Sequence, residues 1–243
     1  TLCVDDVVSF NSNYLKSDSV YWDFGDGTDT TLINRTITHQ YTERGKFPVT
    51  LISYLNGCND TVTKPVNMSV QKVDATFYTT GNRTLICKDE PGKDFVELNH
   101  ADTLDATTGL WHFGGQNTAP YEKGSDVSPR KYFVNNGVYD SIGLSVESPN
   151  GCKDSSYISI IVNGPDGEVK MSPTIICKDD PVNYEIITSD RMQRFKWIFD
   201  DGDTNSTDMS LSRSFKIADS AEFNPTFEPS LIMYDSSGCT KGF

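Results

Sequence analysis

The stretch Trp22-Asp-Phe-Gly-Asp-Gly-Thr28 decides the fold, because the chain repeats it twice in altered form. The later versions are Trp111-His-Phe-Gly-Gly-Gln-Asn117 and Trp197-Ile-Phe-Asp-Asp-Gly-Asp203. In every version a phenylalanine follows the tryptophan by two positions, so both side chains point to the same face of a strand. The glycines of the first version permit the positive φ of a tight turn. This spacing indicates three copies of one small domain.

Cysteines mark both ends of each copy. An opening cysteine follows a leucine or an isoleucine, and a closing cysteine follows a glycine. The opening cysteines are Cys3, Cys87 and Cys177, and the closing cysteines are Cys58, Cys152 and Cys239. The first two opening cysteines are 84 residues apart and the next two are 90 residues apart, the length of one β-sandwich domain. We therefore predict three domains, at residues 1-72, 73-165 and 166-243.

Short β-branched or aromatic runs bounded by turn residues predict strands throughout the chain. These runs are Val7–Phe10, Val49–Tyr54, Phe95–Leu98, Tyr157–Val162 and Tyr184–Ile187. Since no segment shows a sustained helical period, the predicted fold is all-β, with three tandem immunoglobulin-like β-sandwiches. Their expected core residues are Trp22, Phe24, Trp111, Phe113, Trp197 and Phe199, with Tyr41 and Tyr132 at tyrosine corners.

The copies differ at their ends. Copies two and three have a candidate strand before the opening cysteine, at Asp74–Thr80 and Glu168–Met171, whereas copy one has two residues there. Copies one and two have a strand after the closing cysteine, and copy three has four residues there. We expect copy one to lack its first strand and copy three its last. The missing strands then come from a longer chain of repeats or from another chain.

Repeat symmetry predicts one disulfide inside each domain, which gives every copy the same internal bridge. The expected pairs are Cys3 with Cys58, Cys87 with Cys152 and Cys177 with Cys239. The alternative is six buried free thiols. A zinc site is disfavoured, because the chain has no CxxC or close Cys/His pair. Disulfides imply an oxidising compartment, so we expect a secreted or cell-surface protein. No apolar run approaches the ~18 residues of a membrane span, so direct membrane insertion is not expected.

The first copy resembles the PKD (polycystic kidney disease) domain family. The resemblance is carried by the stretch from Trp22 to Thr28, by His39-Gln-Tyr41 and by Gly45-Lys-Phe-Pro-Val-Thr-Leu51. Copy two has Gly115-Gln116 where Asp-Gly is usual, and Arg130-Lys-Tyr132 in place of the His-x-Tyr element. Copy three has Asp200 for the first glycine and Phe215 for the tyrosine.

The paired-cysteine form with an Asn-Gly-Cys closer looks like the tandem PKD repeats of large Bacteroidota cell-surface proteins, including gliding-motility adhesins. That resemblance implies a non-catalytic extracellular stalk or adhesin segment, which forms a cell-surface filament for adhesion or gliding. Its implied partners are neighbouring repeats of the same chain and surface polysaccharide or protein ligands. Two alternatives remain open. One is an accessory binding segment of a secreted hydrolase, and the other is a self-assembling extracellular fibre.

Charge excludes one class of partner. The chain has 21 basic and 34 acidic residues, and its net charge is −13. It therefore lacks the basic face that a phosphate backbone requires, and we expect no nucleic acid ligand.

The repeats also argue against an enzyme. His39, His100 and His112 fall at unrelated repeat positions. The acidic motif is not kept either, because Asp23 is replaced by histidine and then by isoleucine in the later copies. A group needed for catalysis in every copy would not change in this way, so no catalytic residue is expected.

Calcium is the one candidate cofactor, since hard cations prefer several oxygen ligands. The candidate ligands follow the opening cysteines: Asp5, Asp6, Asp89, Glu90, Asp179 and Asp180. Asp200, Asp201 and Asp203 form a further acidic group. The alternative is that all of them are solvated turn carboxylates.

Two surface features complete the sequence predictions. Asp-(Ser/Thr) pairs resemble the Bacteroidota O-glycosylation signal, with acceptors Ser19, Thr30, Thr61, Thr103, Ser141 and Ser220. A carbohydrate-binding module would need an exposed aromatic patch. The tyrosines whose exposure would reveal one are Tyr14, Tyr54, Tyr78 and Tyr121.

Overall fold

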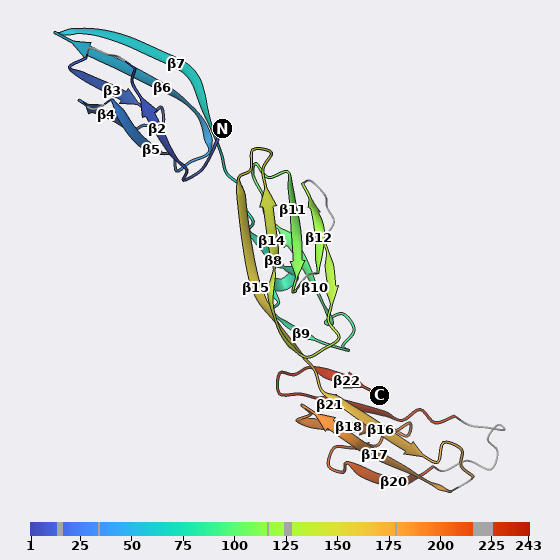
Figure 1. Ribbon diagram of the computed structural model, residues 1–243. Coiled ribbons are helices and arrows are strands. Elements are labelled where there is room, and N and C mark those ends of the chain that lie inside the picture. Colours follow the sequence, from blue (N-terminus) through green and yellow to red (C-terminus); the bar gives the residue numbers. More distant parts are fainter. Residues whose placement is uncertain (14–16, 34, 116, 124–127, 178, 216–225) are drawn as a thin grey trace. The chain divides into compact units, whose positions relative to one another are not determined.

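The fold is all-β. The computed structural model describes residues 1–13, 17–33, 35–115, 117–123, 128–177, 179–215 and 226–243, without the side chains of residues 62–67 and 122. Apart from one 3-10 turn, η1 (Thr80–Asn82), every regular element in these ranges is a strand (Figure 1). The strands form six sheets, two in each of the first (1–72), middle (73–165) and last (166–243) segments. The described residues include no helix with the length and apolar character needed to cross a bilayer.

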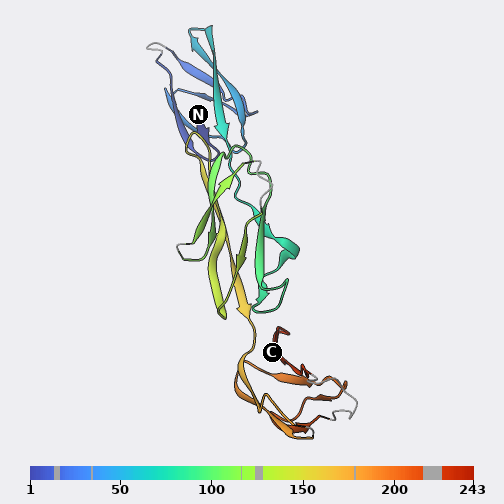
Figure 2. The same cartoon turned by 90° about the vertical axis from the view of Figure 1, so that its right-hand side faces the viewer.

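A long hairpin organises the first segment. Its larger sheet has the order β1-β7-β6-β3-β4, and β2 pairs with β5 in the smaller one. The strands are β1 (Leu2–Cys3), β2 (Val7–Asn11), β3 (Ser19–Asp23), β4 (Asp29–Leu32), β5 (Thr36–Gln40), β6 (Gly45–Leu55) and β7 (Cys58–Gln71). The hairpin strands β6 and β7 have 11 and 14 residues and lie side by side in both views (Figures 1 and 2).

The middle segment has the same plan. Its larger sheet has the order β12-β11-β14-β15-β9, and its smaller sheet has the order β13-β10-β8. The strands are β8 (Phe77–Thr79), β9 (Leu85–Cys87), β10 (Phe95–His100), β11 (Thr108–Phe113), β12 (Thr118–Glu122), β13 (Arg130–Tyr132), β14 (Gly137–Glu147) and β15 (Lys153–Asn163). In both segments the strand with the opening cysteine pairs in parallel with the end of the long hairpin, β1 with β7 and β9 with β15.

The last segment has sheets of order β16-β17-β20 and β19-β18-β21-β22. The strands are β16 (Asp166–Ser172), β17 (Pro181–Asp190), β18 (Arg194–Ile198), β19 (Thr204–Asn205), β20 (Ser210–Ser214), β21 (Ser230–Tyr234) and β22 (Thr240–Gly242). Among the described residues, the larger sheet here has four strands where the other two segments have five. The smaller sheet of the first segment has two strands where the other two have three.

Alternating burial of side chains along the strands forms the cores. Burial alternates residue by residue along β3, β18 and β21 and along the first six residues of β17, as expected where one face of a sheet packs inward. The structure buries the tryptophan and the phenylalanine of every repeated stretch: Trp22, Phe24, Trp111, Phe113, Trp197 and Phe199. Tyr41 is also buried, and its hydroxyl donates a hydrogen bond of 3.1 Å to the carbonyl oxygen of Phe24. This bond reaches a carbonyl 17 residues upstream, whereas a tyrosine corner bonds the backbone a few residues upstream, so it is not the expected tyrosine corner.

The expectation for Tyr132 is wrong. Its side chain is 53% exposed, whereas the next residue, Phe133, is buried. On β13, Tyr132 lies opposite Phe95 of β10, and the two ring centroids are 5.3 Å apart. Successive side chains of a strand face opposite sides, so a shift of one residue moves a ring from the core to the surface. The equivalent of Tyr41 in the middle segment is therefore Phe133.

The prediction of one disulfide inside each domain is also wrong. The structure contains Cys3–Cys152 and Cys87–Cys239, which link different segments, and leaves Cys58 and Cys177 free. The length of β7 explains the error. Cys3 pairs with Gln71 at the end of that strand, and Cys58 begins it. At about 3.3 Å per residue the two cysteines are roughly 40 Å apart, far beyond the ~7 Å that a disulfide spans between Cα atoms.

The chain divides into two compact units, and the division passes through the middle segment. One unit contains Thr1–Tyr78, Asn99–Val127 and Gly143–Tyr157, and the other contains Thr79–Leu98, Ser128–Ile142 and Ile158–Phe243. Each disulfide lies inside one unit. The junction between the first and middle segments thus belongs to one unit, and the junction between the middle and last segments belongs to the other.

Candidate functional site

The candidate site is a pair of junctions, each closed by a disulfide. The Cα atoms are 5.5 Å apart in Cys3–Cys152 and 5.1 Å apart in Cys87–Cys239, both usual for a disulfide. Each bond joins the opening cysteine of one segment to the closing cysteine of the next. The sequence separations, 149 and 152 residues, are nearly equal, so the same connection is made twice.

A tight turn follows each opening cysteine. The cysteine carbonyl accepts a hydrogen bond from the amide three residues later, at 3.1 Å for Cys3, 3.4 Å for Cys87 and 3.1 Å for Cys177. The aspartate two residues after the cysteine has positive φ, 70° at Asp5, 61° at Asp89 and 64° at Asp179. Aspartate is among the few non-glycine residues that adopt this conformation readily. The first aspartate of each acidic pair is therefore a turn residue.

The second acidic residue stabilises the turn or the junction. A carboxylate oxygen of Asp6 accepts a hydrogen bond of 2.8 Å from the amide of Cys3, and Asp180 accepts one of 3.0 Å from Cys177. Glu90 pairs with Lys93 and accepts a hydrogen bond from the amide of Thr240. These contacts explain the acidic pairs without a cation.

No calcium site is assembled from the predicted ligands. Among the described residues, no group of three or more His, Cys, Asp or Glu side chains could hold a metal ion. In the other acidic group, Arg213 forms ion pairs with both Asp201 and Asp203 and so neutralises part of its charge. The calcium interpretation and the solvated-turn interpretation both stay predictions.

A hairpin end presents each closing cysteine. Cys58 begins β7 directly after the turn from β6, and Cys152 and Cys239 lie in the turns of the β14–β15 and β21–β22 hairpins. The glycine before each cysteine has positive φ: 80° at Gly57, 86° at Gly151 and 86° at Gly238. A side chain at these glycines would be strained, which explains the Gly-Cys pair in every copy.

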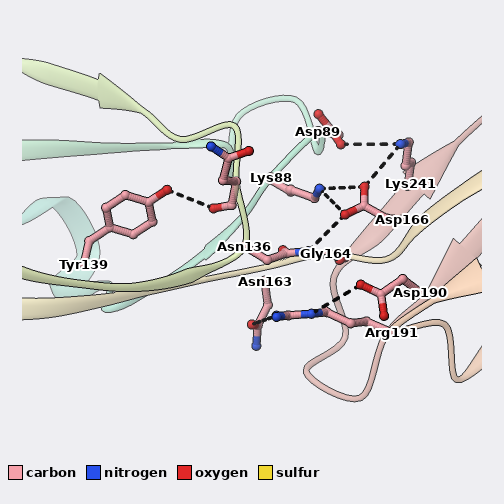
Figure 3. A network of polar contacts seen from close by, with 11 residues as sticks. Lys88, Asp89, Asn136, Tyr139, Asn163, Gly164, Asp166, Asp190, Arg191 and Lys241 are labelled. Carbon is pink, nitrogen blue, oxygen red and sulfur yellow. Dashed lines mark hydrogen bonds and ion pairs between the residues drawn. The ribbon is translucent and has the colours of Figure 1, made fainter.

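An ionic network surrounds the junction of the middle and last segments (Figure 3). The ammonium nitrogen of Lys88 lies 2.6 Å from both carboxylate oxygens of Asp166, and the ammonium of Lys241 lies 3.6 Å from the same carboxylate. The side-chain amide of Asn136 donates to the carbonyl oxygen of Gly164 at 3.0 Å and to Asp166 at 3.2 Å. Figure 3 shows Lys88 and Lys241 pointing toward Asp166 from two sides. One carboxylate thus connects both segments and the linker between them.

The network changes the acidity of Asp166. Its partial burial favours the neutral acid, but the hydrogen bond and the charge of Lys88, with a further contribution from Lys241, outweigh that effect. The pKa of Asp166 is therefore below its ordinary value. Asp166 is charged at neutral pH and balances two lysines in a chain whose net charge is −13.

Asp105 has a similar role at the junction of the first and middle segments. Its carboxylate accepts a hydrogen bond of 3.0 Å from the amide of Lys72 and lies 3.6 Å from the guanidinium of Arg44. Asp154, beside the disulfide-bonded Cys152, accepts a hydrogen bond of 2.8 Å from the amide of Ala75. The sequence analysis missed Asp105, Asp154 and Asp166, because no repeat or motif distinguishes them in so acidic a chain.

The predicted glycosylation acceptors are scattered over the described surface. Thr61 and Ser141 are exposed, Ser19 and Thr30 are half-buried, and Ser220 lies outside the described residues. Thr103 is buried, and its hydroxyl is 2.6 Å from that of Tyr121, so the expectation that it is an accessible acceptor is wrong.

The tyrosines whose exposure would indicate a carbohydrate-binding patch differ in burial. Tyr78 is 51% exposed, Tyr54 is half-buried and Tyr121 is buried. Tyr14 lies outside the described residues. These positions therefore give no support to an aromatic binding patch.

Comparison with known protein families found a match in the first segment. Residues 1–70 match the model of the PKD domain. The first segment is a PKD domain. The match agrees with the buried Trp22 and Phe24 of its core and with the Tyr41 hydrogen bond to the Phe24 carbonyl. A PKD domain in a chain with disulfides is typical of an extracellular protein. No curated protein sequence matches the chain.

The structural neighbours have immunoglobulin-like character. Murine CEACAM1b is 11% identical with a TM-score of 0.29, and the match covers 70% of this chain and 96% of that one. SGBP-B of the Bacteroides ovatus mixed-linkage glucan utilization locus, in complex with a mixed-linkage heptasaccharide, is 12% identical with a TM-score of 0.24. The match covers 99% of this chain and 61% of that one. The four N-terminal Ig domains of Dscam1 isoform 9.44 are 12% identical with a TM-score of 0.25 and coverage of 99% and 68%.

Proposed function

We propose that the chain is a non-catalytic stalk segment of an extracellular adhesin, made of three tandem PKD-type modules that are tied together by disulfides. The observation that carries the proposal is the connection of an opening cysteine to the next closing cysteine, made twice along the chain. A disulfide between neighbouring modules limits how far they can separate, whereas a disulfide inside one module acts on that module alone. Such a connection suits a protein segment that carries mechanical load.

The junction contacts support the same function. Lys88 is almost fully buried against Asp166, and Asp105 bonds the linker residue Lys72. Hydrogen bonds to charged groups contribute about 1.5–3 kcal/mol each when they are shielded from water. Each linker is thus held by polar contacts in addition to its disulfide.

The histidines are engaged in structural contacts, which supports a non-catalytic role. His39 stacks on Phe24 with ring centroids 3.9 Å apart, and its Nε2 atom is 2.7 Å from a carboxylate oxygen of Asp26. His112 bonds the hydroxyl of Ser145, and His100 bonds the backbone carbonyl of Ala101. The contacts of His39 and His100 are not an arrangement of nucleophile and base. His112 is a base beside a hydroxyl, and the proposal assigns this pair a structural role.

Single-molecule pulling from the two ends tests the stalk function. The shortest covalent route from Cys3 to Cys239 crosses the first disulfide to Cys152, follows the 65 residues back to Cys87 and then crosses the second disulfide. At about 3.6 Å per residue this route can extend to about 230 Å, whereas the 236 residues from Cys3 to Cys239 in the reduced chain can extend to about 850 Å. Three separate unfolding events under reducing conditions would support three modules. Full extension without a reductant would contradict the load-bearing disulfides.

A further inference from the structure

Two cysteines take no part in the inter-segment bonds. Cys58 and Cys177 are both free and both exposed. Cys58 is a closing cysteine, like the bonded Cys152 and Cys239, and Cys177 is an opening cysteine, like the bonded Cys3 and Cys87. The chain thus has one unused cysteine of each class.

The sequence around Cys58 matches that of the bonded closing cysteine Cys152. Asn56-Gly57-Cys58 is identical in sequence to Asn150-Gly151-Cys152. Both glycines have the same left-handed conformation, with φ of 80° and 86°. The turns differ, because Leu55 pairs with Cys58 across a two-residue loop, whereas the amide of Ser148 bonds the carbonyl of Cys152 across a three-residue loop. Cys58 is free and exposed, and it shares with Cys152 the Asn-Gly-Cys sequence and the left-handed glycine.

The backbone around Cys177 matches that of the bonded opening cysteines. The amide of Cys177 donates to Asp180 at 3.0 Å, as the amide of Cys3 donates to Asp6 at 2.8 Å. The next turn residue, Asp179, has a φ of 64°, close to the 70° of Asp5. The turn that follows Cys3 is thus also present at Cys177, although Cys3 lies in β1 and Cys177 lies in no described strand.

The order of the bonds defines which class of cysteine each free cysteine would bond. Every bond runs from an opening cysteine to the closing cysteine of the following segment. By the same rule Cys177 requires the closing cysteine of a module that follows it, and Cys58 requires the opening cysteine of a module that precedes it. Cys3 cannot satisfy Cys58, because it is bonded to Cys152 and lies at the other end of β7.

We propose that Cys58 and Cys177 are cross-linking sites for further PKD-type modules, Cys58 for an opening cysteine and Cys177 for a closing one. This inference rests on the proposed function, since it extends the same array. The shared chemistry is a cysteine thiol in a module of this kind. Either another module of the same polypeptide or a second copy of this chain supplies it. Between two copies, the bond joins Cys177 of one to Cys58 of the other.

The reaction is a thiol–disulfide exchange with a small disulfide such as oxidised glutathione. The Cys177 thiolate attacks one sulfur of the oxidant, which gives a mixed disulfide and releases one glutathione thiol. The Cys58 thiolate of the partner then attacks the Cys177 sulfur and releases the second glutathione. Two protein thiols become one disulfide, and one oxidant disulfide is reduced to two thiols.

Matched single variants test the pairing between copies. Cys58→Ser keeps Cys177, and Cys177→Ser keeps Cys58. In a glutathione redox buffer each variant alone should stay monomeric, and an equal mixture should give a covalent heterodimer with a Cys177–Cys58 bond in peptide mapping. The intact Cys3–Cys152 and Cys87–Cys239 bonds verify that both variants are folded. Homodimers that form as readily as the heterodimer would overturn the proposal.

A tandem fusion of two full chains tests whether another module of the same polypeptide supplies the partner cysteine. A bond from Cys177 of the first copy to Cys58 of the second, at the mass of one fusion chain, supports the proposal even if separate copies do not join. The absence of the bond in both experiments would overturn it. That result would leave the stalk function intact, because the pulling experiment depends only on the two bonds already present.

Discussion

Lys88 places its ammonium nitrogen 2.6 Å from both carboxylate oxygens of Asp166, across the boundary between two segments. The lysine side chain is 7% exposed and the aspartate is 40% exposed, so the pair is only partly shielded from water. Breaking a fully buried pair costs about 3–5 kcal/mol, and an exposed pair contributes about 0–1 kcal/mol. The contribution of this pair lies between those limits.

Replacement of Lys88 should weaken the junction. Lys88→Met removes the ammonium group and leaves Asp166 with weaker partners, so we expect a loss of roughly 1–3 kcal/mol in unfolding free energy. Urea denaturation at pH 7 measures it. Lys153→Met is the matched control, because Lys153 is 71% exposed and 3.4 Å from Glu147. Equal losses of unfolding free energy in the two variants would show that the burial of Lys88 does not contribute to stability.

Acid should destabilise the same junction. The pKa of Asp166 is lowered in the fold, mainly by Lys88 acting against burial, so its stabilising effect is complete above the ordinary value of about 3.9. That effect is lost as the pH falls through the lower folded value. The stability difference between the wild type and Asp166→Asn should therefore shrink below about pH 4. Asp190→Asn, at an exposed carboxylate, is the control. A constant difference down to pH 2 would contradict the lowered pKa.

Alkali should destabilise the first segment through Tyr41. Burial, with the charges of Asp26 and Asp23, raises the pKa of Tyr41 to about 12. The neutral phenol stabilises the fold fully below the unfolded value of about 10, and this effect is lost as the pH rises toward 12. Tyr41→Phe should cost about 1 kcal/mol at pH 7, through loss of the hydrogen bond to Phe24, and should flatten the decline above pH 10.

Tyr139→Phe is the control for that variant. The hydroxyl of Tyr139 also donates to a backbone carbonyl, that of Asn135, at 3.1 Å, but near the surface. Thermal unfolding followed by circular dichroism should show the smaller change for this variant. The reverse order would contradict a stabilising role for the buried hydrogen bond of Tyr41.

Two buried tryptophans should respond differently to the same substitution. The indole N–H of Trp197 donates to the carbonyl oxygen of Asp208 at 3.2 Å, whereas that of Trp22 has no hydrogen-bond partner among the described residues. Trp197→Phe loses ring volume and a hydrogen bond, and Trp22→Phe loses ring volume alone. We expect the first variant to lose about 1 kcal/mol more in urea denaturation. Equal losses would argue against the indole bond.

Peptide mapping under non-reducing conditions should find Cys3 joined to Cys152 and Cys87 joined to Cys239, with Cys58 and Cys177 either alkylated as free thiols or joined to each other between copies. Reduction should loosen the linkers, so limited proteolysis near residues 163–166 should be faster with a reductant. Recovery of a Cys87–Cys152 peptide would restore the original prediction of bonds within domains.

Much of the fold could be predicted from the repeated stretches. The two-residue spacing of Trp22 and Phe24 implies one buried face, and the structure buries both. Tyr132 shows the limit of this reasoning. Residues 130–132 resemble the His-x-Tyr element, but strand register decides which residue faces the core, and register depends on the pairing with β10.

Disulfide connectivity could not be derived from repeat symmetry. Pairing within a copy and pairing with the next copy both give every repeat the same bonds. The choice depends on where β1 and β7 end in space. Cys3 pairs with Gln71, so it lies far along β7 from Cys58, and only the structure provides that pairing. The junction aspartates were hidden for a similar reason, because Asp166 matters through its contact with Lys88 and carries no local motif.

The staggered bonds also affect what proteolysis can do. Cys3–Cys152 bridges any cut of the backbone between those residues, and Cys87–Cys239 bridges any cut between its own two residues. The two spans overlap between Cys87 and Cys152. A protease that cuts the chain once anywhere between Cys3 and Cys239 therefore leaves two fragments joined by at least one covalent bond. In an environment rich in secreted proteases, such a segment can be nicked without being severed.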